Sequence, residues 1–133
     1  MFKYLAIALL AFSCLTLAGC QKDAEVGKFI TDLDAMSKDV VKAVDDSPNE
    51  AGVDAAQKIF DAKKGDIKSQ LDALKTARAS TEMTEKLTTS VKNNVTAVLG
   101  LQSKYIQESM NNPGFKEKLD KLGKDYVDML KMQ

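Results

Sequence analysis

The side chains best suited to covalent chemistry are two thiols, and both lie within the first 20 residues. Cys14 and Cys20 are the only cysteines of the 133-residue chain, which contains no histidine. Without histidine the common general base for activating a serine or thiol is missing, so a catalytic triad is excluded. Ser37-Lys38 and Ser103-Lys104 are serine–lysine neighbours, but consecutive residues of a helix point to different sides. We therefore expect no catalytic residues and no enzymatic activity.

A metal site in this chain would depend on oxygen or sulfur ligands. The closely spaced carboxylates are Asp32/Asp34, Asp45/Asp46 and Asp120/Asp125, and none has the spacing of a calcium-binding loop. Met129 and Met132 are three residues apart and could share one helix face, and methionine thioethers are ligands that copper accepts. Methionines also fill hydrophobic cores, and that role is the simpler interpretation. The sequence thus predicts no metal site and no bound cofactor.

The two thiols belong to a segment with the composition of a secretion signal. Lys3 gives a positively charged beginning, residues 5–17 are mostly apolar, and the small residues Ala18 and Gly19 follow. The apolar run is shorter than the ~20 residues of a comfortable membrane-spanning helix. We therefore expect residues 1–19 to be a signal peptide.

The residues Leu17-Ala18-Gly19-Cys20 resemble the lipobox of bacterial lipoproteins and match its preferred form at all four positions. The resemblance covers only the first 20 residues. It implies that the Cys20 thiol receives a diacylglyceryl group and that a signal peptidase cleaves between Gly19 and Cys20. Acylated Cys20 would then anchor the chain to a lipid bilayer, since each buried CH₂ contributes about 0.8 kcal/mol. An ordinary signal peptide, or an uncleaved helix with Cys20 as a bystander, is the alternative.

The residues after Cys20 bear on where the anchored protein lies. In enterobacterial lipoproteins an aspartate at the next position retains the protein in the inner membrane. Gln21 stands there, so the resemblance implies the outer membrane, facing the periplasm. Residues 20–22 form the lipidated cysteine and a short tether, and at ~3.5 Å per extended residue the chain reaches on the order of 10 Å before a helix begins near Asp23. We therefore expect a membrane-proximal envelope protein as the partner.

The charge balance excludes another class of partner. The chain has 19 basic and 19 acidic side chains, and only Lys3 lies before residue 20, so 18 basic and 19 acidic side chains follow. Such a balance gives no electrostatic footprint for nucleic acid. We expect no nucleic-acid binding.

Apolar residues recur with helical spacing through residues 23–133, and turn signals divide this domain into four segments. The predicted helices span 23–44, 48–79, 82 to the break at residues 111–114, and 113–131. Ser47, Pro48 and Glu50 have the pattern of a capping box that starts the second helix. Gly65 marks either a bend in that helix or a close helix crossing. The core stripes are Val26, Phe29, Leu33, Met36, Val40 and Ala43; Val53, Phe60, Ile67 and Leu74; Leu87, Val91, Val98, Leu101 and Tyr105; and Phe115, Leu119, Leu122, Tyr126 and Met129.

These stripes predict an all-α fold, because amphipathic helices must share a core. The expected architecture is an antiparallel up-and-down bundle of three long helices plus a shorter C-terminal helix, with short junctions joining neighbours. Helical i,i+4 spacing predicts solvent-exposed ion pairs at Asp34/Lys38, Asp54/Lys58, Glu82/Lys86 and Glu117/Lys121.

Three polar or aromatic positions leave alternatives open. Asn94 falls on an apolar stripe, where it either fixes helix register through a buried hydrogen bond or lies at the edge of the stripe. Tyr105 and Tyr126 either line a hydrophobic groove or belong to the core, which is the favoured interpretation.

The function expected from these features is that of a non-enzymatic protein-binding or structural accessory of the cell envelope. This function predicts that an apolar strip along Val95, Ile106 and Met110 stays exposed after the bundle packs. The alternative is a carrier that binds a small hydrophobic ligand or lipid in a cavity between the helices.

Overall fold

The computed structural model describes residues 22–131, and the secondary-structure elements found there are all helices. Three long helices, α2 (Asp23–Asp46), α3 (Glu50–Leu74) and α4 (Thr81–Lys104), are followed by a short α5 (Ile106–Asn111) and by α6 (Pro113–Leu130). The prediction of an all-α chain with three long helices and a shorter C-terminal one is confirmed. The separate helix α5 was not expected, because the stripe of the third predicted helix runs through it without a break.

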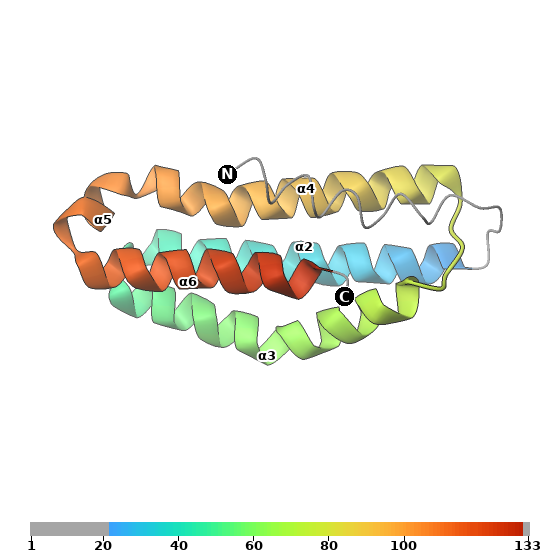
Figure 1. Ribbon diagram of the computed structural model, residues 1–133, viewed down its shortest axis with the longest axis horizontal. Helices are drawn as coiled ribbons and strands as arrows, with labels where there is room; N and C mark the ends of the chain where they lie inside the picture. The colour runs from blue at the N-terminus through green and yellow to red at the C-terminus, as the bar shows by residue number, and fades with distance from the viewer. Residues whose placement is uncertain (1–21, 132–133) are drawn as a thin grey trace.

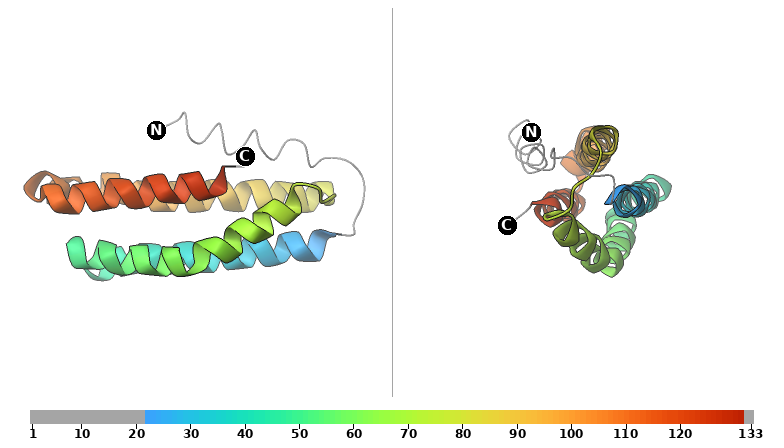
Figure 2. Two further views of the ribbon diagram at one scale, coloured as in Figure 1. Left: turned by 60° about the horizontal axis from the view of Figure 1, so that its bottom comes forward. Right: turned by 90° about the vertical axis from the view of Figure 1, so that its right-hand side faces the viewer.

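Each long helix packs against two others around one shared core. The packed pairs are α2 with α3, α2 with α4, α3 with α6, and α4 with α6. The view along the bundle axis in Figure 2 shows that the connection between α3 and α4 crosses the end of the bundle, so that these two helices lie diagonally opposite. Helices α3 and α4 are therefore not neighbours, although their short junction had led us to expect it.

The predicted apolar stripes form the core. Nearly all of their residues are at most 6% exposed, and Val44, Ala56, Leu71 and Leu130 are buried with them. Ala43 and Tyr105 are the exceptions, since both are only partly buried against the core. The spacing of apolar residues thus identified the buried face of every long helix, because a helix with one apolar stripe gains stability only by burying it.

The turn between α2 and α3 differs from its prediction. Asn49, and not Ser47, caps α3: its side-chain oxygen accepts a hydrogen bond from the backbone N–H of Gly52 at 3.2 Å. Pro48 lies before the helix. Gly52 is buried, and a Cβ atom there would lie 1.8 Å from the Ser47 carbonyl oxygen. The chain can therefore turn this tightly only because residue 52 has no side chain, which the capping pattern did not reveal.

Helix α3 also ends earlier than predicted, at Leu74 instead of Ala79. The Ala77 N–H donates to the Leu74 carbonyl oxygen at 3.1 Å, which closes a turn after the helix. Ala77 and Ala79 remain buried, so they join the core from the connection and not from a helix. Figure 1 shows α3 bent near its middle. Nothing lies within 4 Å of a Cβ atom built on Gly65, which excludes a close helix crossing at that residue.

Candidate functional site

The residues predicted to carry the lipid lie outside the described part of the chain. This holds for Cys20, for Gly19 at the predicted cleavage point and for the rest of the predicted signal peptide. The first described residue is Lys22, and α2 begins directly after it at Asp23, as expected. Any attachment at Cys20 is therefore separated from the bundle by two residues, Gln21 and Lys22.

The beginning of α2 is joined to the beginning of α4. The Asp23 carboxylate accepts hydrogen bonds from the Ser80 backbone N–H at 2.8 Å and from the Ser80 hydroxyl at 2.7 Å. The same hydroxyl oxygen accepts a bond from the Met83 N–H at 3.2 Å and so caps α4. The two bonds from Ser80 lower the pKa of Asp23, because they stabilise its charged form. The helix that follows the predicted anchor is thus braced at its first residue.

At the opposite end of the bundle, Tyr105 interrupts the helix that the sequence predicted to be continuous. Its hydroxyl donates to Asp45 at the end of α2 over 2.5 Å, and Lys104 contacts the same carboxylate oxygen at 2.8 Å. The Tyr105 ring packs edge-on against Phe115, with ring centroids 6.3 Å apart. Lys104 and then Tyr105 lower the pKa of the Asp45 carboxyl through these bonds. Tyr105 therefore fastens the α4–α5 junction to α2 and α6.

Helix α5 carries the exposed apolar residues of this end. Ile106 is 56% exposed and Met110 is 77% exposed, and they are the large hydrophobic residues exposed in the described chain. They are four positions apart, which places them on one side of a helix. Val95, expected in the same strip, is buried. We call Ile106 and Met110 the α5 apolar pair.

A polar network links α2 to α4 at the edge of their interface, where Asp34 is exposed. Asp34 Oδ1 accepts hydrogen bonds from the Ser90 hydroxyl at 2.7 Å and from the Asn94 amide at 2.5 Å. Asn94 is buried and makes an interhelical hydrogen bond, as one of its two predicted roles required, but the acceptor Asp34 is exposed and the bond is only partly buried. Every acceptor and donor of this network that is buried has a protein partner, as stable helix packing requires. The network therefore has a structural role and supplies no reactive group.

Tyr126 belongs to the core, as favoured from the sequence. It is 0% exposed, its hydroxyl lies 2.5 Å from Ser37 Oγ, and its ring is 6.1 Å from that of Phe60. The Ser37 hydroxyl donates its hydrogen to the Leu33 carbonyl oxygen at 2.8 Å, so Tyr126 must be the donor to Ser37. Burial raises the pKa of the Tyr126 hydroxyl, because the charged form would be desolvated.

The carboxylates considered as metal ligands are held apart by other contacts. Asp120 pairs with Lys116 and Asp125 with Lys121, on different flanks of α6. In residues 22–131 no group of three or more acidic or thiol side chains lies close enough to hold a metal ion. Met129 is buried in the core, whereas Met132 lies outside the described residues.

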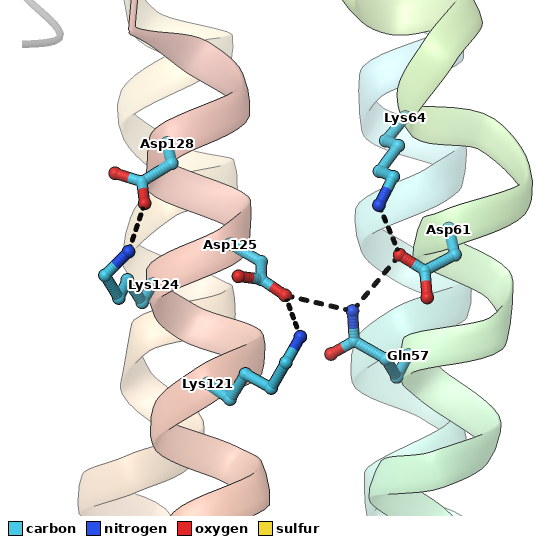
Figure 3. Close-up of polar contacts among 7 residues, drawn as sticks. All are labelled: Gln57, Asp61, Lys64, Lys121, Lys124, Asp125 and Asp128. Carbon is cyan, nitrogen blue, oxygen red and sulfur yellow. Dashed lines mark hydrogen bonds and ion pairs between the residues drawn. The ribbon is translucent and has the colours of Figure 1, made fainter.

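A second set of polar contacts joins α3 to α6 at the surface. Gln57 Nε2 donates to Asp61 at 3.3 Å on its own helix and to Asp125 at 3.2 Å on α6. Figure 3 shows this bridge and shows Lys124 and Asp128 on the flank of α6 that points away from α3. The two flanks of α6 are therefore chemically different: one binds α3, and the other borders the gap toward α4.

Three grooves between the helices open to solvent. The one between α4 and α6 has a volume of about 420 Å³, and its floor contains Leu99, Gly123 and Val127. The other two run between α2 and α3 and between α2 and α4. No helix within residues 22–131 is long and apolar enough to cross a membrane. No protein-family model, curated protein or solved structure matches this chain.

Proposed function

We propose that this chain is a lipid-anchored helical lipoprotein that faces the periplasm and acts as a non-enzymatic protein-binding accessory of the cell envelope. The observation that carries the proposal is the α5 apolar pair. Ile106 and Met110 are exposed at one end of the bundle, while α2 begins at the other end. Exposed large apolar side chains on an otherwise charged surface commonly mark contact sites for other proteins.

The anchor in this proposal is Cys20, acylated after cleavage behind Gly19. Its support is the signal-like segment 1–19 and the lipobox Leu17-Ala18-Gly19-Cys20. Gln21 favours the outer membrane over the inner one. Because α2 begins at Asp23, the bundle would be held at the bilayer surface, and its protein partner would be membrane-proximal.

The bundle in this proposal is of the antiparallel up-and-down kind, in which each long helix reverses the direction of the one before it. The turns at residues 47–49 and 75–80 and the α5 segment support this path. They connect the helices alternately at the two ends of the bundle (Figure 1).

Protein binding is favoured over ligand transport because the centre of the bundle is filled. Phe29, Leu33, Met36, Leu87 and Leu122 are each 0% exposed. The grooves between the helices are open at the surface, whereas a carrier encloses most of its ligand. The absence of histidine, and of cysteine after residue 20, favours a non-enzymatic role.

Site-specific photo-crosslinking in living cells tests the proposed contact. A photoreactive amino acid replaces Met110 in one strain and the exposed neighbour Gln107 in the matched control. We expect a discrete crosslinked protein from position 110, none from position 107, and loss of the product when Ile106→Ser is added. Equal products from both positions, or none from position 110, would contradict the proposal.

A further inference from the structure

The groove between α4 and α6 has an apolar floor that is formed by a close helix approach. A Cβ atom on Gly123 of α6 would lie 3.0 Å from Leu99 Cδ2 and 3.1 Å from Gln102 Nε2 of α4. Side chains of α4 therefore rest directly on the α6 backbone. Leu99 is only partly buried there, so the groove leaves apolar surface open to solvent beside Val127.

One edge of this groove carries a regular row of charges. Lys116, Asp120, Lys124 and Asp128 follow each other at four-residue steps on α6, and we call them the α6 charge row. Along the helix, Lys116 contacts Asp120 at 2.5 Å and Lys124 contacts Asp128 at 2.7 Å. Asp120, Lys124 and Asp128 line the groove. Figure 3 shows Lys124 and Asp128 on the flank of α6 that faces away from α3, and Lys131 also contacts Asp128 there at 2.6 Å.

The order of these charges is self-complementary in one orientation. When a second α6 lies antiparallel to the first about a two-fold axis midway between Asp120 and Lys124, Lys116 faces Asp128 of the second copy and Asp120 faces its Lys124. All four contacts across the axis then join opposite charges. Parallel alignment in the same register would place lysine against lysine and aspartate against aspartate. A two-fold interface uses the same patch on both subunits and therefore requires this property.

We propose that the groove between α4 and α6, with the α6 charge row, is the surface through which a second copy of this chain binds, with the two α6 helices antiparallel. A lysine ammonium has three donors, so it can keep its neighbour along the helix and also meet an aspartate of the other copy. The aliphatic stems of the lysine side chains cover Leu99 and Val127 while their charged ends remain in water. The charges set the orientation, and the groove supplies the apolar contact.

Two complementary variants test this interface in the full-length chain, extracted from bacterial membranes in detergent. The first variant, called the lysine row, carries Asp120→Lys and Asp128→Lys, so that all four positions of the α6 charge row are lysine. The second variant, called the aspartate row, carries Lys116→Asp and Lys124→Asp, so that all four positions are aspartate. Each is produced with its own affinity tag, and association is measured by co-purification and by light scattering. Either variant alone should self-associate at least about tenfold more weakly than the wild type, because four attractive contacts become repulsive. Mixing the two should restore association, since lysine then faces aspartate everywhere.

Two further variants separate this effect from a loss of folding. Asp120→Lys with Lys124→Asp disturbs the pairs along α6 but keeps opposite charges facing across the axis, so it should still self-associate. Reversing Glu82 and Lys86, an exposed pair on α4 at 2.7 Å, is the control away from the groove and should change nothing. Circular dichroism establishes that each variant is helical.

Several results would overturn the proposal. The wild type could be monomeric, or self-association could survive in either row variant. The mixture of the two row variants could fail to associate. The groove could also crosslink only to another protein. Failure here is distinguishable from failure of the proposed function, because Met110 does not line the groove. Met110→Ser should leave self-association unchanged even where it abolishes binding to the envelope partner.

Discussion

The hydroxyl of Tyr126 in α6 lies 2.5 Å from Ser37 Oγ in α2 and joins two helices that face each other across the core. Tyr126→Phe should lower the free energy of unfolding by about 1 kcal/mol, the contribution of a typical hydrogen bond. Ser37→Ala should cost about 1–3 kcal/mol, because it leaves a fully buried hydroxyl without a partner. Urea denaturation of both single variants and the double variant measures their coupling. Strictly additive effects would show that the two hydroxyls do not interact.

The same tyrosine predicts a dependence of stability on alkaline pH. Burial raises the pKa of Tyr126 above its ordinary value of 10.0. A raised folded-state pKa gives stability that is complete below pH 10 and is lost as the pH rises beyond it, because the unfolded chain releases the proton first. The stability advantage of the wild type over Tyr126→Phe should therefore shrink above pH 10. A constant difference up to pH 11 would contradict this assignment.

Two glycines should respond oppositely to replacement by alanine. Gly52→Ala should destabilise the protein by about 1–3 kcal/mol, because its Cβ would overlap the Ser47 carbonyl oxygen and the α2–α3 turn must open. Gly65→Ala should stabilise it by about 0.5–1 kcal/mol, since the space around it is empty and alanine favours helix. Thermal unfolding of the two variants beside the wild type provides the comparison. A stabilising Gly52→Ala would rule out the steric explanation of the turn.

The bond between Asp23 and Ser80 should weaken in acid. The pKa of Asp23 is lowered below 3.8 by its bonds to Ser80, so their stabilising effect is present above that pH and is lost as the pH falls through the folded-state value. Asp23→Ala should lower the melting temperature at pH 7 and have little effect well below pH 3.8. Ser80→Ala removes the cap of α4 as well and should cost about 1 kcal/mol at neutral pH. Equal effects of Asp23→Ala at both pH values would argue against the ionic contribution.

Cys20→Ala should abolish incorporation of labelled fatty acid and release the chain from the membrane fraction. The expected reason is that this thiol is the acceptor of the lipid. Cys14→Ala is the matched control, because Cys14 lies inside the predicted signal peptide and should be dispensable for labelling. Unchanged labelling of the Cys20 variant would refute lipidation at this residue.

Apolar spacing predicted the buried helix faces well, because each stripe is a property of one segment. Contacts between segments were harder to predict from the sequence. The pair Glu82/Lys86 forms as expected at 2.7 Å. Asp34 instead bonds Ser90 and Asn94 of α4, and Asp54 bonds Lys118 of α6 at 2.7 Å. A spacing rule within one helix cannot anticipate a partner that another helix brings closer.

The helix interruption at Tyr105 escaped prediction for a similar reason. The local sequence continues the apolar stripe, and nothing in it breaks a helix before Asn111. The interruption coincides with the contacts that Tyr105 makes with Asp45 and Phe115, which come from distant parts of the chain. Ile106 and Met110 are exposed, as expected for the predicted strip, whereas Val95, expected in the same strip, is buried.

The junction of Asp23 with Ser80 also determines how the bundle would respond to mechanical tension. A pull on the amino end of the chain reaches Asp23 first, and its two hydrogen bonds pass part of that force directly to the first turn of α4. Two helices therefore share the stress, and α2 is not drawn out alone. If Cys20 is lipidated as proposed, this connection lies within three residues of the anchor and would receive the tension that bilayer motion places on the chain.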